Sequence, residues 1–180
     1  MRTADDVLTF WFEDHGPDDW FAARPDFDAA IAREFAETHA AIARGEGWGW
    51  RSTPGGRLAE IIVLDQFSRQ LFRGRAKAFA SDGMALALAQ EAVGGGHHNF
   101  LPAARRGFFL LPFMHAESAL MQQESVRLHM ALGNPDQLKF ARDHAEIIQR
   151  FGRFPRRNAA LGRPSTPEEE AYIISSQGAF

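Results

Sequence analysis

The sequence predicts an all-α protein of antiparallel helix pairs, as in an α-solenoid or an irregular bundle. Apolar residues recur at helical spacing through most of the chain, and capping residues, prolines and glycines separate the apolar stretches. We find no convincing alternation of apolar and polar residues of the kind that is typical of a strand. Short helices joined by short turns favour antiparallel neighbours, although no clean repeat of fixed period is present.

The composition indicates one all-helical domain spanning residues 1–180. A chain of 180 residues with 45% hydrophobic residues can bury a sizeable core. It has 16 Phe and 4 Trp against a single Tyr, which predicts a core of large rings with few polar groups. The net charge of −3 gives no overall field that would favour nucleic acid or an anionic membrane, so any recognition of anions must be local.

Several classes of protein are excluded or disfavoured. The chain has no cysteine, which excludes disulfides, thiolate nucleophiles and cysteine-based zinc sites. Acids near the N-terminus and the lack of an apolar run of about 20 residues predict a cytoplasmic protein without a signal peptide or a membrane span. No glycine-rich phosphate loop and no G-x-S-x-G motif are present. We therefore predict no cofactor, no nucleic-acid partner and no membrane partner, while the oligomeric state stays open.

Caps and helix breakers divide the N-terminal half. Thr3 is a good cap for the first helix, with Asp6 as the acid of a capping box, and a turn over residues 14–18 ends this helix. Three further helices are expected: one over 26–43, one that begins at Ser52 or Thr53 with Pro54 just inside and ends near Phe72, and one over 81–93.

The C-terminal half is expected to hold three helices. Pro102 opens a helix through Leu111, which Pro112 kinks or restarts and which then continues to about Leu132. A turn at 133–135 leads to a helix over 136–151. The last helix has a strong start, with Thr166 as cap, Pro167 in the first position and Glu169 as the capping-box acid.

The most unusual segment is residues 150–163, which we call the arginine loop. It carries five arginines and no acid, and Gly152, Pro155 and Gly162 shape it as a loop. Arginine is rarely buried unless it is paired. The counter-charge comes either from the protein's own carboxylates or from an anionic ligand, and the sequence leaves both open.

Two charged residues fall on the apolar face of the third expected helix. Asp65 and Arg69 lie one turn apart on that face, so both should be partly desolvated and paired. We interpret them as a structural ion pair in the first place, with contact to a ligand as the alternative. The neighbouring Gln66 belongs to a polar strip that could line a cleft.

A polar stripe follows the helix expected after Pro112. At 100° per residue the stripe holds His115, Ser118, Gln122, Ser125 and His129, which we interpret as a solvated face. Glu117 and Glu124 fall instead on an apolar face, where they suit counter-ions for the arginine loop.

The next helix places His144 at the centre of an apolar arc that includes Phe140. We interpret a lone histidine on such a face as a core residue whose hydrogen bonds are satisfied, in preference to a catalyst or a ligand. His115, Glu117 and His144 could in principle hold a metal. Their spacing matches no compact motif, and residues two apart do not share a helical face, so we predict no metal site.

Five stretches of the chain resemble, in the expected order, the bacterial family catalogued as domain of unknown function 924. They are residues 7–12, 64–69, 79–82, 111–117 and 151–163, with the sequences VLTFWF, LDQFSR, FASD, LPFMHAE and FGRFPRRNAALGR. The resemblance spans nearly the whole chain. It implies an all-helical, compact tetratricopeptide-like right-handed superhelix, and no established activity.

Three positions depart from the pattern of this family. Ser68 and Gln70 stand where the pattern has proline and asparagine, and Arg156 stands where histidine is usual. If that histidine is catalytic in the family, this chain lacks it.

Three functions stay open. The first is a module that binds a small anionic ligand or a peptide carboxylate in one polar pocket. The second is a hydrolase or transferase acting on a small anionic substrate, with His115 beside Glu117 or Asp65 as general base. The third is a purely structural polar network. The ligand-binding candidates are Asp65, Gln66, Arg69, His144, Arg153, Arg157, Asn158 and Arg163; the catalytic candidates are His115 and Glu117.

Overall fold

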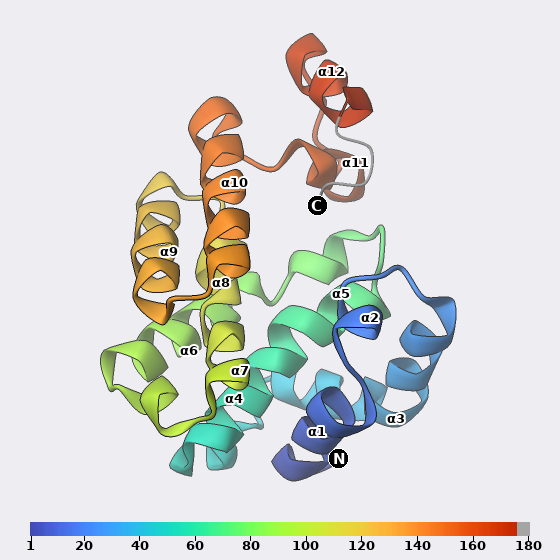
Figure 1. The fold of residues 1–180 in the computed structure, drawn as a ribbon. Coiled ribbons are helices and arrows are strands. Elements are labelled where there is room, and N and C mark those ends of the chain that lie inside the picture. Colours follow the sequence, from blue (N-terminus) through green and yellow to red (C-terminus); the bar gives the residue numbers. More distant parts are fainter. Residues whose placement is uncertain (176–180) are drawn as a thin grey trace. The chain divides into compact units, whose positions relative to one another are not determined.

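The computed structural model describes residues 1–175, and the regular elements of this part of the chain are all helices (Figure 1). The all-α prediction is therefore confirmed for these residues, while the superhelical arrangement stays a prediction. The last five residues of the expected 1–180 domain lie outside the described residues. Among the described helices, none combines the length and the apolar character that a membrane crossing requires.

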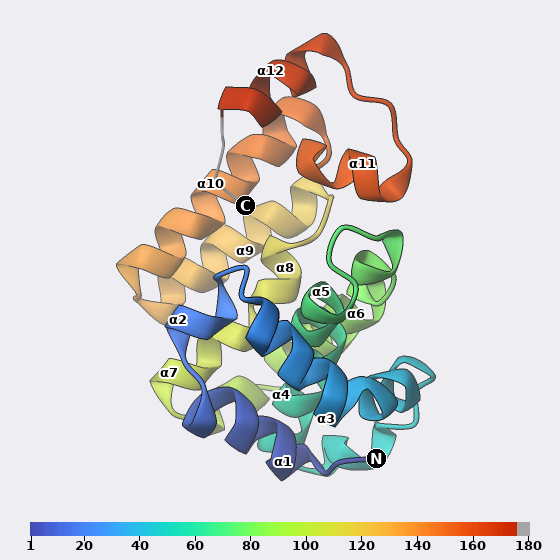
Figure 2. The ribbon, with the colours of Figure 1, turned by 90° about the vertical axis from the view of Figure 1, so that its right-hand side faces the viewer.

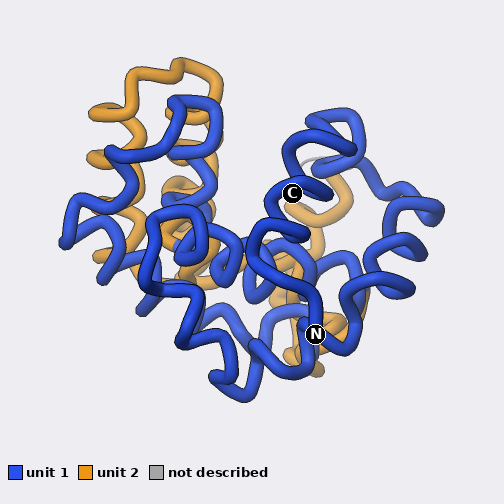
Figure 3. The backbone as a smooth tube through the Cα atoms, turned by 90° about the horizontal axis from the view of Figure 1, so that it is seen from below, with its two compact units in different colours: residues 1–73, 77–112 blue, residues 74–76, 113–180 orange. Residues whose placement is uncertain are grey.

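The chain divides into two compact units (Figure 3). The first consists of residues 1–73 and 77–112, and the second of residues 74–76 and the chain from 113 onward. Asp65, Gln66 and Arg69 belong to the first unit, whereas His115, Glu117, His144 and the arginine loop belong to the second. The expectation that all these side chains line one pocket stays a prediction.

The first unit is built from helices close to those expected. Its α-helices are α1 (Ala4–Thr9), α2 (Pro17–Trp20), α3 (Pro25–Ala43), α4 (Pro54–Ile62), α5 (Ser68–Leu71), α6 (Asp82–Gly94) and α7 (Ala103–Arg106). Short 3₁₀ segments lie at Trp48–Ser52, His97–Phe100 and Gly107–Phe109. A fourth, Ala76–Phe79, belongs to this unit except for its first residue. Both expected caps are present: Thr3 forms a capping box with Asp6, and the Thr53 hydroxyl accepts the Gly56 N–H at 3.0 Å.

Two helices of this unit continue as π-helical turns. Phe10–Asp14 follows α1, and Val63–Phe67 joins α4 to α5, so the third expected helix is present but widened at its centre. A π-helical turn adds a residue to the ring closed by each hydrogen bond, and such turns are frequent at functional sites. Asp65 and Gln66 lie within the second of these turns, and both are buried.

Large rings fill the core of the first unit, as the composition predicts. Phe67 is fully buried and lies 5.6 Å from Trp11 and 5.1 Å from Phe35 between ring centroids. Trp11 stacks on Trp20 at 5.6 Å, and the Trp20 indole N–H donates to the Trp11 carbonyl at 2.8 Å. These contacts place α2, α3 and the two π-helical turns, at 10–14 and 63–67, around one aromatic cluster.

The second unit is built around a helical pair. Its helices are α8 (Leu111–Met114), which begins at the end of the first unit, α9 (Ala119–Leu132), α10 (Pro135–Phe151), α11 (Asn158–Leu161) and α12 (Pro167–Ser175), with a 3₁₀ turn at Pro155–Arg157. α9 and α10 lie side by side (Figures 1 and 2). Gly133 closes the turn between them at φ +77°, a conformation that favours glycine.

The long helix expected to continue from Pro112 to about Leu132 is wrong as a continuous element. α7, α8 and α9 are separate, and residues 115–118 between α8 and α9 are not helical. Ser118 begins the last of them, since its hydroxyl accepts the Met121 N–H at 3.4 Å. Serine competes for backbone donors in this way and therefore starts a new helix. His115 and Glu117 lie in the break and on no helical face.

The solvated stripe expected on this helix is also wrong. Gln122, Ser125 and His129 are buried, whereas Leu120 is 68% exposed. The Gln122 amide donates to the carbonyls of Met114 at 2.7 Å and Ala116 at 2.8 Å, which are acceptors left open by the end of α8. A wheel drawn across the break has the wrong phase, and a polar side chain with such partners can be buried.

Candidate functional site

In the first unit, Asp65 and Arg69 form the expected ion pair at 3.1 Å. Asp65 is 1% exposed, so the prediction of a desolvated pair is confirmed. Arg69 also donates to both carboxylate oxygens of Asp82, each at 3.1 Å. Burial acts to lower the pKa of Arg69, but the charges of Asp65 and Asp82 raise it above its ordinary value. Gln66 donates its amide to Asp65 at 2.5 Å.

Asp82 is a partner that the sequence analysis did not identify. It stands at the first residue of α6, thirteen residues after Arg69. An acid in the first turn of an expected helix was visible in the sequence, but its distance to Arg69 depends on how α5 and α6 pack.

Ser68 and His39 form a buried pair that is not arranged for nucleophilic catalysis. The Ser68 hydroxyl donates to the Leu64 carbonyl at 2.6 Å, so it accepts the His39 Nε2–H at 2.8 Å. Burial, with a smaller effect of Lys77, lowers the pKa of His39 to about 4. The ring is therefore a donor to Ser68 and not its base.

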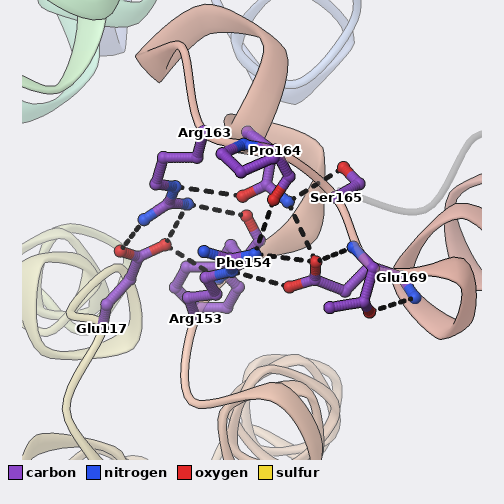
Figure 4. A network of polar contacts seen from close by, with 9 residues as sticks. Glu117, Arg153, Phe154, Arg163, Pro164, Ser165 and Glu169 are labelled. Carbon is purple, nitrogen blue, oxygen red and sulfur yellow. Dashed lines mark hydrogen bonds and ion pairs between the residues drawn. The ribbon is translucent and has the colours of Figure 1, made fainter.

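Three arginines of the arginine loop have glutamate partners, and Figure 4 shows two of these pairs, Arg153 with Glu169 and Arg163 with Glu117. Arg153 binds Glu169 through two hydrogen bonds at 2.6 and 2.8 Å, and Arg163 binds Glu117 at 2.6 and 2.9 Å. Arg150 binds Glu168 at 2.9 Å. The protein's own carboxylates thus supply the counter-charge at these three positions.

Glu117 is held firmly as a carboxylate. It accepts the Phe154 backbone N–H at 2.8 Å in addition to the two bonds from Arg163. Burial acts to raise the pKa of Glu117, but these hydrogen bonds and the charges of Arg163 and Arg157 hold the pKa below its usual range. A carboxylate with these contacts is a weak base. The prediction that it assists His115 in catalysis stays a prediction, which the contacts of Glu117 do not favour.

Glu124 has a different role from the one expected. It pairs with Arg127 on its own helix, at 2.8 Å to the guanidinium Nε. The prediction that it serves the arginine loop is therefore wrong, because Glu124 lies on the part of α9 that faces solvent and finds its partner three residues away.

Glu169 joins a capping box to the arginine loop. Its carboxylate accepts the Thr166 N–H at 2.8 Å, which confirms the expected cap of the last helix, and it also binds Arg153. The bonds from Arg153 and from the Thr166 N–H lower the pKa of Glu169 to about 2. The capping role was visible in the sequence, whereas the ion pair was not.

Asn158 connects the two main ion pairs. Its amide oxygen accepts from Arg163 at 3.0 Å, and its amide nitrogen donates to Ser165 at 3.0 Å and to Glu169 at 3.3 Å. Asn158 is fully buried, so its polar atoms are satisfied inside this network.

A second group in this unit contains His115, His144, Phe154 and Arg157, and we call it the imidazole–arginine cluster. The Phe154 ring lies 5.5 Å from the His144 ring, and the Arg157 guanidinium carbon lies 4.7 Å from the same Phe154 ring. The rings of His115 and His144 are 6.1 Å apart, and Arg157 donates to the His115 carbonyl at 2.9 Å. His115 and Arg157 are half-buried, and His144 is buried.

The electrostatics of this cluster keep His144 neutral. Its Nδ1–H donates to the Phe140 carbonyl at 2.8 Å, so protonation would occur at Nε2. Burial first, and then the proximity of His115 with a further effect of Arg157, lowers the pKa of His144 to about 3. The buried His144 agrees with the expected core histidine, although Phe140 of the same expected arc is 47% exposed.

Within residues 1–175 no three or more carboxylates and imidazoles converge as metal ligands would.

These contacts define the chain as a helical protein whose C-terminal loop carries an ion-paired arginine network. Over residues 7–177 the chain matches the family described as bacterial protein of unknown function (DUF924), and it belongs to that family. The structure of a protein of unknown function from Agrobacterium tumefaciens is similar at 40% identity, with a TM-score of 0.91, over 96% of this chain and 97% of that chain. No curated protein matches the chain.

Proposed function

We propose that the protein is a binding module for a small anion, phosphate or carboxylate, and that the imidazole–arginine cluster holds this anion. One observation carries the proposal: the Arg157 guanidinium and the His144 ring both lie against the Phe154 ring, and the His115 ring lies 6.1 Å from the His144 ring. The charge of Arg157, which also helps to lower the pKa of His144, attracts an anion. Two carboxylates act against this attraction: Glu117, whose pKa the charge of Arg157 lowers, and Asp143.

The arrangement of the cluster supports recognition. The Phe154 ring and the His115 carbonyl hold the Arg157 guanidinium, which restricts the freedom that binding would otherwise have to remove. His115 and Arg157 both reach solvent in part. A guanidinium beside imidazoles can donate charge-assisted hydrogen bonds to phosphate or carboxylate oxygens.

The experiment is calorimetric titration with inorganic phosphate and with acetate. Arg157→Gln should weaken binding of whichever anion the wild type binds by about tenfold or more, since one charge-assisted contact is worth about 1.5–3 kcal/mol. Arg127→Gln is the matched control, because Arg127 is an exposed arginine of the same unit and should leave affinity unchanged. His115→Gln tests the cluster without removing the guanidinium. Equal affinity in the wild type and both cluster variants would reject this site.

A purely structural network is the second candidate, and the arginine–glutamate pairs favour it. Arg153 and Arg163 each bind a glutamate through two hydrogen bonds, and Asn158 joins both pairs. On this interpretation Arg153→Gln and Arg163→Gln lower stability without any change in anion affinity. A change in anion affinity confined to these two variants would instead place the ligand on the network.

A further inference from the structure

The attachment of α12 to the rest of the second unit is mainly polar. Within Pro167–Ser175 the one buried residue is Glu169, while Ile174 is 69% exposed. Tyr172 is half-buried and lies 5.2 Å from the Phe151 ring, beside the small apolar cluster of Ile147, Ile148 and Phe154. An α-helix docked through so few apolar contacts depends on its charged contacts.

The surface that receives α12 includes Arg150, Phe151, Arg153, Asn158 and Arg156, whose guanidinium donates to the Ile173 carbonyl of α12 at 3.4 Å, and we call it the helix seat. Arg153 binds the Glu169 carboxylate at both oxygens (Figure 4). Asn158 donates to the same carboxylate. Arg150 binds Glu168 in a pair whose side chains are both more than half exposed. Exposed pairs of this kind contribute about 0–1 kcal/mol each.

The charges of the helix seat complement those of the helix that it receives. The first turn of α12 carries three consecutive glutamates, at 168–170, and the seat presents two arginines to them. The capping box also fixes where the docked helix begins, because the Thr166 N–H and Arg153 both bind the carboxylate of Glu169. Tyr172 follows Glu169 by three residues and lies on the same side of the helix.

We propose that α12 is displaceable and that the helix seat receives the acidic, capped first turn of a helix from a partner protein. Such a partner helix carries a capping Ser or Thr, a glutamate three residues later, and an aromatic residue three residues after that glutamate. In the isolated chain α12 occupies the seat as an internal competitor. Its tether is short, so its effective concentration is high and a partner must exceed it in affinity.

The experiment measures binding of an acetylated peptide with the sequence of residues 164–175 to the full chain. Thr166→Ala weakens the cap of the internal helix and leaves the seat unaltered, and an N-cap is worth about 1 kcal/mol, or roughly fivefold in affinity. Glu169→Gln removes the main anchor of α12 and should increase peptide binding further, by about tenfold or more over the wild type. Glu170→Gln is the control and should bind the peptide as the wild type does.

Two further measurements make the result decisive. Arg153→Gln combined with Thr166→Ala should abolish the gain, and about 0.5 M salt should reduce it, because both remove the charge complementarity. Circular dichroism of each variant shows whether the chain is still folded. Equal peptide binding to the wild type, Thr166→Ala and Glu169→Gln would overturn the proposal. Concentration-dependent dimerisation of Thr166→Ala, by exchange of α12 between copies, would also overturn it, because the occupant would then be a second copy.

Discussion

The ion pair in the first unit and the arginine network in the second use the same residue types in different surroundings. The side chain of Asp65 is 1% exposed, and Asp65 lies in the same π-helical turn as Phe67 of the aromatic core. In contrast, the side chains of Arg163 and Glu117 are each 24% exposed. In the first unit the packing of large aromatic rings supplies most of the stability, and the ion pair of Asp65 with Arg69 lies within that unit. In the second unit the apolar cluster near α12 is small, and charged groups hold the loop and the last helix together.

The difference follows from desolvation. A buried carboxylate requires several partners because its separation from water is costly, and Asp65 has Arg69 and Gln66. A partly solvated carboxylate gains less from each partner and loses less without it. Substitutions in the two regions should therefore differ in magnitude and in their dependence on salt and pH.

The largest effect is expected in the aromatic core. Phe67→Ala should lower the free energy of unfolding by about 3–5 kcal/mol, because it leaves a cavity among Phe10, Trp11 and Phe35. Urea unfolding followed by far-ultraviolet circular dichroism measures it. Phe100→Ala is the control, since Phe100 is 77% exposed and its loss should cost less than about 0.5 kcal/mol. Similar losses in both variants would contradict an aromatic core as the main source of stability.

The next largest effect is a loss of stability at acidic pH. The folded-state pKa of His39 is about 4, against 6.5 for the unfolded chain, so the unfolded state binds more protons between these values. The contribution of neutral His39 to the free energy of unfolding is therefore complete above pH 6.5 and is lost as the pH falls towards 4. At pH 5 this histidine alone should cost about 2 kcal/mol relative to pH 7.

Unfolding of His39→Gln measured from pH 7.5 to 4.5 tests this expectation. The variant should lack this part of the decline and keep the part that comes from His129 and His144, whose pKa values burial also lowers. An unchanged pH profile would show that folding does not lower the pKa of His39.

The smallest effect is expected in the arginine network. Glu117→Gln should lower the free energy of unfolding by about 1–2 kcal/mol, because the amide keeps an acceptor for the Phe154 N–H but loses the charge that pairs with Arg163. The loss should shrink at about 1 M salt, since solvent ions screen a partly exposed pair. Glu124→Gln is the control, and its exposed pair with Arg127 should contribute about 0.5 kcal/mol or less. A loss that is equal at low and high salt would indicate a packing role in place of an electrostatic one.

Much of the fold could be predicted from the sequence because its signals are local. Thr53 with Pro54, and Thr166 with Pro167 and Glu169, mark helix starts within a few residues, and the structure has caps at both places. The break at Ser118 was missed because a serine inside an apolar pattern is compatible with a continuing helix. Because that break was missed, Phe113 and Glu117 were placed on one wheel with residues of α9, although they do not belong to that helix.

The candidate site was predicted in part. Asp65 with Arg69, and Glu117 with the arginine loop, were expected as pairs and are paired. Asp82 and Glu169 were not expected as ion-pair partners, although both stand in the first turn of a helix where acids are common. Residue type alone does not distinguish an acid that only caps a helix from one that also binds an arginine elsewhere.

The sequence by itself determined that this chain forms helices, roughly where they begin and end, and that its arginine loop needs counter-charges. Those properties depend on a few neighbouring residues and on the cost of desolvating a guanidinium group. Only the tertiary structure decided which glutamate meets which arginine and which polar residues are buried. A hydrogen bond between residues 117 and 163 requires a particular packing of the segments between them, and no local pattern encodes that distance.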